Sequence, residues 1–363
     1  MKIGFDARMI SHPGIGRYIK NLLDFMFKRE DPENFVLFGY PEELQEFIPA
    51  KIVAYRQPIY RWKELFFSPF AEYGLGLAHI PHFNAPLKKR CPLVITIHDL
   101  IYLKIDDSAG GYKRFAVKQV ISNAVKKADR IIAVSRNTQN DIISFFPKAK
   151  DKISVIHEAA DPIFRKIVDR QTLESTRKLF SLPEKYILFV GSLKKHKNIE
   201  GLIRAHNQLR EKGIEHRLVI TGRFHWQERQ ILEKIKAGGA LYLGETSDAE
   251  LVNIYNLADL VVLPSFYEGF GLPVLEAMAC QTPVIASNVS SLPEIIADPA
   301  SLFDPKSEDE IAEKIYLHLT DDSVKRECIQ NGEKIISKFN WPSSAEKTLN
   351  LYRELLNDEK NAE

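Results

Sequence analysis

Two glutamates, Glu268 and Glu276, flank a glycine-bearing turn in the sequence EGFGLPVLE at residues 268–276. The apolar run 260–263 precedes the turn, and Pro273 stands where the first turn of a helix tolerates a residue without an N–H group. The sequence therefore predicts a strand, a loop and a helix start in this order. The positive end of such a helix suits a phosphate, glycines let the backbone approach it closely, and carboxylates accept hydroxyl groups. A nucleotide sugar has this chemistry.

The same two carboxylates could be the acid and the nucleophile of a glycosidase. In those enzymes the two carboxyl groups lie about 5 to 9 Å apart and flank one bond, whereas eight residues of helix alone separate two backbones by about 12 Å. A pair divided between a loop and a helix fits the holding of a ligand better. A solvated glutamate before a turn and another on a helix surface remain the alternative.

The composition is that of a globular protein of ordinary domain size. The chain has 363 residues, 45% of them hydrophobic and 27% charged, which is enough for two domains with substantial cores. It has no apolar run of 18 residues, and it enters a strand-like segment directly, so we expect no signal peptide, no membrane span and a cytoplasmic location. The three cysteines are widely spaced, which fits a reducing compartment and gives no zinc pattern.

Positive charge is concentrated in the first half of the chain. Residues 1–170 contain 27 Lys and Arg against 19 Asp and Glu, and residues 171–363 contain 23 against 29. A basic half could meet nucleic acid or an anionic membrane surface. In residues 55–67, YRQPIYRWKELFF, aromatic and basic residues alternate, which favours the membrane interface over nucleic acid, and a buried helix with solvated cations is the alternative. The inner face of the plasma membrane is the surface that this would reach.

Apolar strand-like runs alternate with helical segments along the whole chain. Such a pattern predicts parallel sheets covered on both faces, and the alternation restarts after a polar stretch at residues 165–184. We therefore expect an α/β protein with two doubly wound, Rossmann-like domains, residues 1–170 and 171–342, with a terminal helix at 343–363 that packs back on the first domain. Ligands of such sheets bind at the carboxyl ends of strands, so the expected site is the cleft between the domains.

The first strand leads into Gly14-Ile15-Gly16-Arg17-Tyr18 and a helix that the pattern continues to Phe27. A glycine-rich turn that opens a helix can hold a phosphate, and a purely structural turn is the alternative. It is not a dinucleotide fingerprint, because that motif requires glycine where this chain has Ile19. A nicotinamide enzyme is therefore disfavoured.

Two further strand ends carry polar residues. His98 follows an apolar strand and should point toward a ligand, unless it is a hydrogen-bonded structural histidine. His79 and His82 are interpreted as structural, because Pro81 excludes a helical ligand face and no further ligand completes a metal set. The turn Gly191-Ser192-Leu193-Lys194-Lys195-His196-Lys197 is rich in cations, which can stabilise charge on a departing diphosphate. Lys197 is the best candidate for this role.

Together these motifs resemble glycosyltransferase family 4, the retaining, nucleotide-sugar-dependent enzymes with the GT-B fold of two Rossmann-like domains facing across a cleft. The resemblance covers nearly the whole chain and is most specific at residues 264–279. It implies a first domain that binds the acceptor and a second that binds the nucleotide sugar. Many members carry Arg where this chain has Ser192 and His196, so neutralisation of the diphosphate depends more on Lys197.

The resemblance also implies roles for individual residues. Glu276 would hold the ribose hydroxyls, Glu268 would face the donor sugar, and His98 would contact that sugar from the first domain. Lys197 would neutralise the diphosphate, and base contacts would come largely from backbone near Leu243. The other positions expected to bind the donor are Gly14, Gly16, Ser192, Phe270, Gly271 and Leu272.

The details of the motifs look most like bacterial mannosyltransferases of polysaccharide assembly, which use GDP-mannose and glycan or lipid-linked acceptors. The chain has no Asp-x-Asp sequence, so we expect no metal and no cofactor beyond the donor itself. A transferase that uses a UDP-sugar, a sugar-nucleotide epimerase and a non-catalytic nucleotide-sugar-binding protein of the same fold are the alternatives. An epimerase would act without an acceptor, and a binding protein would bind without turnover.

Overall fold

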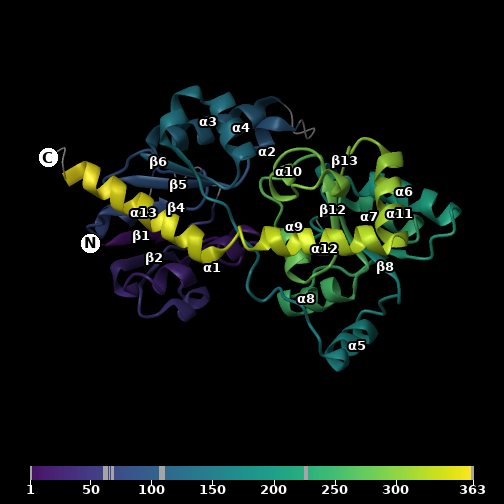
Figure 1. The fold of residues 1–363 in the computed structure, drawn as a ribbon. Helices are drawn as coiled ribbons and strands as arrows, with labels where there is room; N and C mark the ends of the chain where they lie inside the picture. Colours follow the sequence, from purple (N-terminus) through teal and green to yellow (C-terminus); the bar gives the residue numbers. More distant parts are fainter. Residues whose placement is uncertain are drawn as a thin grey trace. The chain divides into compact units, whose positions relative to one another are not determined.

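The structure is a computed structural model that describes residues 2–59, 64, 66, 69–105, 111–224 and 228–360 (Figure 1). The chain forms two compact units. Residues 1–158 and 340–363 make the first, and residues 159–339 make the second. Both are built on parallel sheets with helices on both faces, which confirms the predicted α/β, doubly wound class.

The first unit contains a seven-stranded sheet in the order β3-β2-β1-β4-β5-β6-β7. Its strands are β1 (Ile3–Asp6), β2 (Phe35–Gly39), β3 (Lys51–Ala54), β4 (Leu77–Ile80), β5 (Leu93–Ile97), β6 (Arg130–Ala133) and β7 (Ile153–Val155). Its helices are α1 (Ile15–Phe27), α2 (Ile101–Lys104), α3 (Gly111–Lys127), α4 (Arg136–Phe145) and α13 (Trp341–Lys360).

Alternate residues of β5 face opposite sides of this sheet. Ile95 and Ile97 are fully buried in the core that contains Ile121 of α3 and Ile142 of α4. Thr96, between them in sequence, bonds to Tyr18 of α1 on the other side. The helix α13 packs along α1 on that side (Figure 1).

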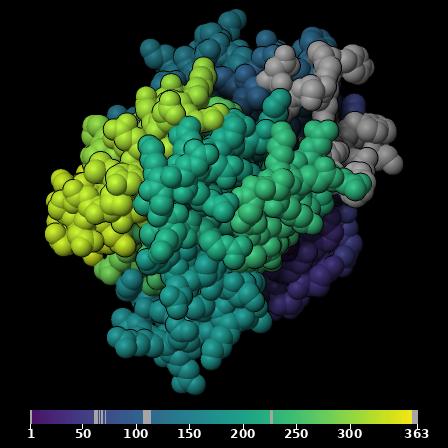
Figure 2. Space-filling model, turned by 90° about the vertical axis from the view of Figure 1, so that its right-hand side faces the viewer, coloured from purple at the N-terminus to yellow at the C-terminus, as the bar shows by residue number. Residues whose placement is uncertain are grey.

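The second unit contains a six-stranded sheet in the order β10-β9-β8-β11-β12-β13. Its strands are β8 (Tyr186–Val190), β9 (Arg217–Thr221), β10 (Leu241–Tyr242), β11 (Leu260–Leu263), β12 (Val284–Ser287) and β13 (Leu302–Phe303). Its helices are α5 (Arg170–Leu179), α6 (Ile199–Glu211), α7 (Arg229–Ala237), α8 (Asp248–Leu257), α9 (Leu272–Ala279), α10 (Leu292–Ile295), α11 (Glu308–Thr320) and α12 (Asp322–Ile336). Figure 2 looks onto the surface that α6 and α7 form, with α5 at the lower edge.

The boundary between the two units does not coincide with a change in the apolar periodicity of the sequence. The sequence pattern divides the chain at residue 170, whereas residues 159–170 belong to the second unit. The ring of Phe164 packs edge-on against Tyr255 of α8, with 5.7 Å between centroids, and the N–H of Ile167 donates to Asn256 at 2.8 Å. These irregular residues are attached by a few specific contacts, which no period in the sequence reveals.

Candidate active site

The loops after β8 and β11 meet where the strand order of the second sheet reverses. β8 and β11 are parallel neighbours, and from them the sheet continues through β9 on one side and through β12 on the other. Connections on the two sides of such a point diverge and leave a crevice at the carboxyl ends of the strands, where open α/β sheets bind ligands. Gly191 follows β8, and Ser265 and Glu268 follow β11. The sequence therefore places its most informative motif at the position that this topology favours.

Lys197 and Glu268 form an ion pair between these two loops. The Lys197 Nζ lies 2.7 and 2.8 Å from the two carboxylate oxygens of Glu268, and Ser265 Oγ donates to one of them at 2.6 Å. Burial alone raises the pKa of the Glu268 carboxyl. The charge of Lys197, the hydrogen bonds from Lys197 and Ser265, and nearby His196 outweigh burial and lower this pKa below its usual value. Glu268 is therefore ionised at neutral pH.

Two serines from the loop after β12 hold the backbone around Glu268. Ser290 Oγ donates to the carbonyl of Glu268 at 2.5 Å and accepts from its N–H at 3.1 Å. Ser291 Oγ donates to the carbonyl of Phe270 at 2.6 Å. Sequence reasoning did not identify either serine. The only local indication is the pair Ser290-Ser291 after a buried strand, because serine hydroxyls at such a position can bond to the backbone of a neighbouring loop.

His196 joins the two loops without adding charge. Its carbonyl accepts the N–H of Phe266 at 2.8 Å, and its ring is buried. Burial, followed by the charge of Lys197, lowers the pKa of His196 to about 4, so the ring is neutral at pH 7. Lys194 and Lys195 are exposed, whereas Lys197 is partly buried. Lys197 is thus the cation of this turn that faces Glu268.

The second glutamate of the motif, Glu276, lies on α9 and has a different partner. Its side chain is buried and accepts a hydrogen bond of 2.8 Å from the hydroxyl of Tyr255 on α8. Gly271 caps α9 with a φ of 113°, a conformation that favours glycine, and Leu272 is the first helical residue. The first N–H groups of a helix have no partner inside it, so this end retains the character of an anion site.

The other donor-binding positions predicted in this unit lie close by. Ser192 follows Gly191 directly and is partly exposed. The N–H of Leu243 donates to the carbonyl of Ile220 at 2.9 Å, so a base contact by Leu243 would use another group. Gly222, which sequence reasoning did not identify, lies against Gly191, and a Cβ built on it would be 2.0 Å from the Gly191 carbonyl oxygen.

Gly14 and Gly16 open helix α1 in the first unit. Gly14 has a φ of 80° and is the N-cap residue. A Cβ on Gly16 would be 2.1 Å from the carbonyl oxygen of Ile10, so close packing of this turn requires glycine there. Both positions therefore have a structural reason for glycine, and their contact with a phosphate stays a prediction.

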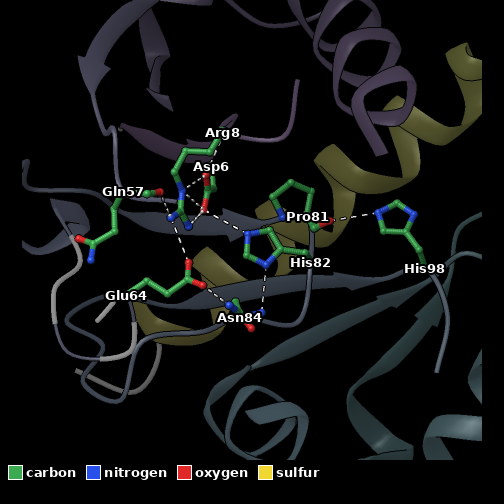
Figure 3. A network of polar contacts seen from close by, with 8 residues as sticks. All are labelled: Asp6, Arg8, Gln57, Glu64, Pro81, His82, Asn84 and His98. Atoms are coloured by element: carbon green, nitrogen blue, oxygen red, sulfur yellow. Dashed lines mark hydrogen bonds and ion pairs between the residues drawn. The ribbon is translucent and has the colours of Figure 1, made fainter. Parts of the chain in front are cut away.

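His98 is held through both ring nitrogens in the first unit. Nδ1 lies 2.8 Å from a carboxylate oxygen of Glu158. Nε2 lies 3.1 Å from the carbonyl oxygen of Pro81 (Figure 3). The ring of Tyr18 packs edge-on against the imidazole, with 4.9 Å between centroids. A contact between Nε2 and a ligand therefore requires exchange of the Pro81 carbonyl. Glu158 is a further residue that sequence reasoning did not identify.

A buried ionic cluster lies at the ends of β1 and β4 (Figure 3). Arg8 pairs with Asp6 at 2.6 Å and with Glu64 at 3.0 Å, and His82 Nε2 lies 3.4 Å from Asp6. Burial raises the pKa of Asp6, but the charge of Arg8 and the hydrogen bonds from His82 and Arg8 lower it well below its usual value. Among the residues that the structure describes, no group of three or more His, Cys, Asp or Glu side chains could hold a metal ion.

The segment expected to meet the membrane is residues 55–67. Tyr60, Arg61, Trp62, Lys63, Leu65 and Phe67 lie outside the described residues. Within the described part of the chain, no helix combines the length and the apolar character needed to cross a bilayer.

Comparison with known proteins gives consistent results for both units. Residues 14–163 match the family described as Glycosyltransferase Family 4, and residues 171–335 match Glycosyl transferases group 1. The chain is 28% identical to the O-antigen chain mannosyltransferase B of Escherichia coli, over 97% of this chain and 100% of the relative. It is 30% identical to the serotype-specific mannosyltransferase WbdA of Escherichia coli, over 76% of this chain but only 35% of WbdA. A sucrose-phosphate synthase from Thermosynechococcus elongatus has the same fold, with a TM-score of 0.78 at 21% identity over 99% of this chain and 100% of that one.

Proposed function

The chain belongs to glycosyltransferase family 4, and from this membership we propose that it transfers mannose from GDP-mannose, with retention of configuration, to a glycan or lipid-linked acceptor in cell-surface polysaccharide synthesis. The observation that carries the mannose assignment is the similarity to the O-antigen chain mannosyltransferase B, which extends over 97% of this chain and all of the relative. The Lys197–Glu268 pair at the strand-order reversal supplies the charged groups that such a transfer needs.

The donor would lie across the carboxyl ends of β8 and β11. Glu276 would accept the ribose hydroxyls, and the N–H groups of Phe270, Gly271 and Leu272 would meet the diphosphate or the sugar. Lys197 would move from Glu268 toward the diphosphate, which leaves the Glu268 carboxylate for the sugar. Ser192 would complete the phosphate contacts that this unit makes, and backbone near Leu243 would meet the base.

The reaction itself needs no nucleophile from the protein. The bond between the sugar C1 and the diphosphate oxygen breaks while the acceptor oxygen bonds to the same face of C1. The acceptor proton passes to a phosphate oxygen of the leaving group. Lys197 would stabilise the negative charge that grows on that group, which is the effect for which a fixed cation in a poorly hydrated site is most useful.

A ligand screen tests this proposal. Calorimetry and thermal unfolding would be measured with GDP-mannose, UDP-glucose, UDP-GlcNAc, GDP and UDP, because a ligand that binds only the folded state raises its stability. We expect the guanosine compounds to bind in preference. Preference for a uridine donor would replace the mannose assignment by the UDP-sugar alternative. Conversion of the donor without an acceptor would instead indicate an epimerase, and binding without turnover would indicate a non-catalytic protein.

We also propose that the first unit associates with anionic membrane, and α3 is the described element that supports this. Its sequence, GYKRFAVKQVISNAVKK, contains five Lys and Arg and no Asp or Glu. Phe115 on this helix is 61% exposed, next to the exposed Arg114 and Lys118. An exposed aromatic ring beside cations is the combination that binds the surface of an anionic bilayer.

A further inference from the structure

His98 contacts two oxygen acceptors, and this arrangement constrains its protonation. Its Nδ1 faces the Glu158 carboxylate at 2.8 Å, and its Nε2 faces the Pro81 carbonyl at 3.1 Å. A carbonyl and a carboxylate can only accept hydrogen bonds, and a neutral imidazole has one N–H group. The ring can therefore donate to both oxygens only when both nitrogens carry hydrogen.

The surroundings of the ring leave Glu158 as the group that can stabilise this form. The Glu158 side chain is 6% exposed and that of His98 is 15% exposed, so water screens their interaction weakly. Tyr18 covers the imidazole edge-on, and its own hydroxyl is bonded to Thr96 at 3.0 Å rather than to His98. His79, a neighbour on β4, is neutral because burial and the charges of His98 and His82 lower its pKa to about 3.

We propose that Glu158 is a positioning residue of the active site, which fixes the orientation of the His98 ring and stabilises its doubly protonated form. The Nε2–H group is then a donor that can exchange the Pro81 carbonyl for an oxygen of the bound substrate. Glu158 does not itself touch substrate. The contact between His98 and a substrate rests on the proposed transferase function. The effect of Glu158 on the orientation and protonation of His98 does not depend on that function.

Glu158 also lies where the chain leaves the first unit, because residue 159 begins the second. The preceding residue, His157, accepts a hydrogen bond of 2.6 Å from Ser344 of α13 through its carbonyl. The position of Glu158 is thus fixed from both sides, by His98 and through its neighbour by α13. A carboxylate held in this way can keep an imidazole in one orientation.

The test compares Glu158→Gln with the wild-type protein by ¹⁵N NMR of the histidine rings at near-neutral pH. His98 is assigned from the spectrum of His98→Gln. Glutamine keeps the size of the side chain and an acceptor oxygen but removes the charge. We expect two similar His98 ring nitrogens in the wild type, both carrying hydrogen, and two widely separated nitrogens in Glu158→Gln. Thermal unfolding of the variant checks that it is folded, and Glu43→Gln, a change at an exposed position of the same unit, is the matched control.

The kinetic arm separates positioning from binding. With donor and acceptor, we expect kcat of Glu158→Gln to fall by about 10- to 100-fold, the range for loss of a carboxylate that orients a histidine, with KM for the donor nearly unchanged. Glu158→Asp, which keeps the charge, should recover part of kcat. An unchanged His98 spectrum in Glu158→Gln, or a neutral His98 in the wild type, would overturn the inference. A wild type with the expected spectrum but no transfer from any donor would refute the proposed function and leave the positioning role standing.

Discussion

Lys197 donates to both carboxylate oxygens of Glu268, at 2.7 and 2.8 Å, across two loops that are 71 residues apart in sequence. Both side chains are largely buried, with 16% and 11% exposed. The Glu268 carboxylate is thus paired with the cation that we propose as the partner of the donor diphosphate. In the proposed function, donor binding would separate this pair, and the attraction between Lys197 and the diphosphate would have to offset the loss.

Replacement of Glu268 by glutamine should therefore affect turnover and stability together. Glu268→Gln keeps a hydrogen bond from Ser265 but leaves the Lys197 charge without its partner. We expect kcat to fall by at least about 10²-fold, as for removal of one preorganised charged group, and the free energy of unfolding to fall by about 1–3 kcal/mol. Transfer assays and urea unfolding measure the two effects.

The matched control for this prediction is an exposed ion pair of the same unit. Lys185 and Glu215 lie 2.9 Å apart with 57% and 76% of their side chains exposed. Glu215→Gln should leave turnover and unfolding unchanged, because exposed pairs contribute little. Wild-type turnover in Glu268→Gln would remove Glu268 from the catalytic site.

Glu276 should act on donor affinity rather than on turnover. Its carboxylate is held by the Tyr255 hydroxyl at 2.8 Å. Glu276→Gln retains an oxygen that accepts this bond but loses the charge that would hold the ribose hydroxyls. A hydrogen bond to a charged group contributes about 1.5–3 kcal/mol, so we expect the Kd of the donor to rise by roughly 10- to 150-fold. Calorimetry with GDP-mannose and GDP measures it, and equal affinity of the two proteins would show that Glu276 has only a structural role.

The sequence predicted the parallel α/β sheets well, because these depend on local patterns. The strands β8, β9 and β11 are continuous apolar runs, and Glu268, Glu276 and Lys197 follow strand ends in one unit. The strand β4 is harder to recognise in the sequence, because His79 interrupts its apolar character. That ring is acceptable in the core because both of its nitrogens have partners: the hydroxyl of Tyr352, 273 residues away, at 2.5 Å and the hydroxyl of Thr96 at 2.8 Å.

The partners that position the site were missed for the same reason. Glu158 lies 60 residues from His98, and Ser290 lies 22 residues from Glu268. Each is an ordinary polar residue in its local sequence, and its role exists only after the chain folds. Local patterns therefore identified the residues that could do chemistry, and long-range contacts decided how they are held.

Gly222 tests the close backbone contact with Gly191, the residue that opens the turn containing Lys197. A Cβ there would be 2.0 Å from the carbonyl oxygen of Gly191, and neither backbone can move freely. We expect Gly222→Ala to lower the thermal unfolding temperature and to weaken donor binding. Gly213→Ala is the control, because Gly213 also has a positive φ, 83°, but nothing lies within 4 Å of its Cβ position. Equal effects of the two variants would show that only the backbone conformation matters.

Reversal of charge on α3 tests the proposed membrane contact. The double variant Arg114→Glu with Lys118→Glu should bind poorly to vesicles that contain an anionic phospholipid. Each cation near such a surface contributes about 1 kcal/mol, so the loss should be at least about 20-fold and should shrink as salt is added. Lys212→Glu with Lys236→Glu makes the same change of charge at exposed positions of the second unit. Equal binding of the two double variants in co-sedimentation would exclude α3 as the contact.

The buried histidine of β4 should make the protein sensitive to acid. His79 is fully buried, between Tyr352 at 2.5 Å and Thr96 at 2.8 Å. Burial, followed by the charges of His98 and His82, lowers the pKa of His79 from 6.5 to about 3. Below pH 6.5 the unfolded chain therefore takes up a proton that the folded chain does not. Stability contributed at neutral pH is lost as the pH falls through this window, by up to about 1.4 kcal/mol for each pH unit.

Substitution of His79 separates this effect from those of the other histidines, which stay the same in both proteins. His79→Gln keeps a polar side chain that can bond to Tyr352 or Thr96 but cannot titrate. Its free energy of unfolding, measured by urea titration at several pH values, should fall less steeply between about pH 6.5 and 4 than that of the wild type. Tyr352→Phe is the complementary variant: it leaves the histidine in place with one nitrogen unpaired, so it should lose about 1–3 kcal/mol at neutral pH and keep the steep acid dependence. If the free energy of unfolding of His79→Gln depends on pH as steeply as that of the wild type, His79 is not neutral in the folded protein. The ring between Tyr352 and Thr96 would then be charged.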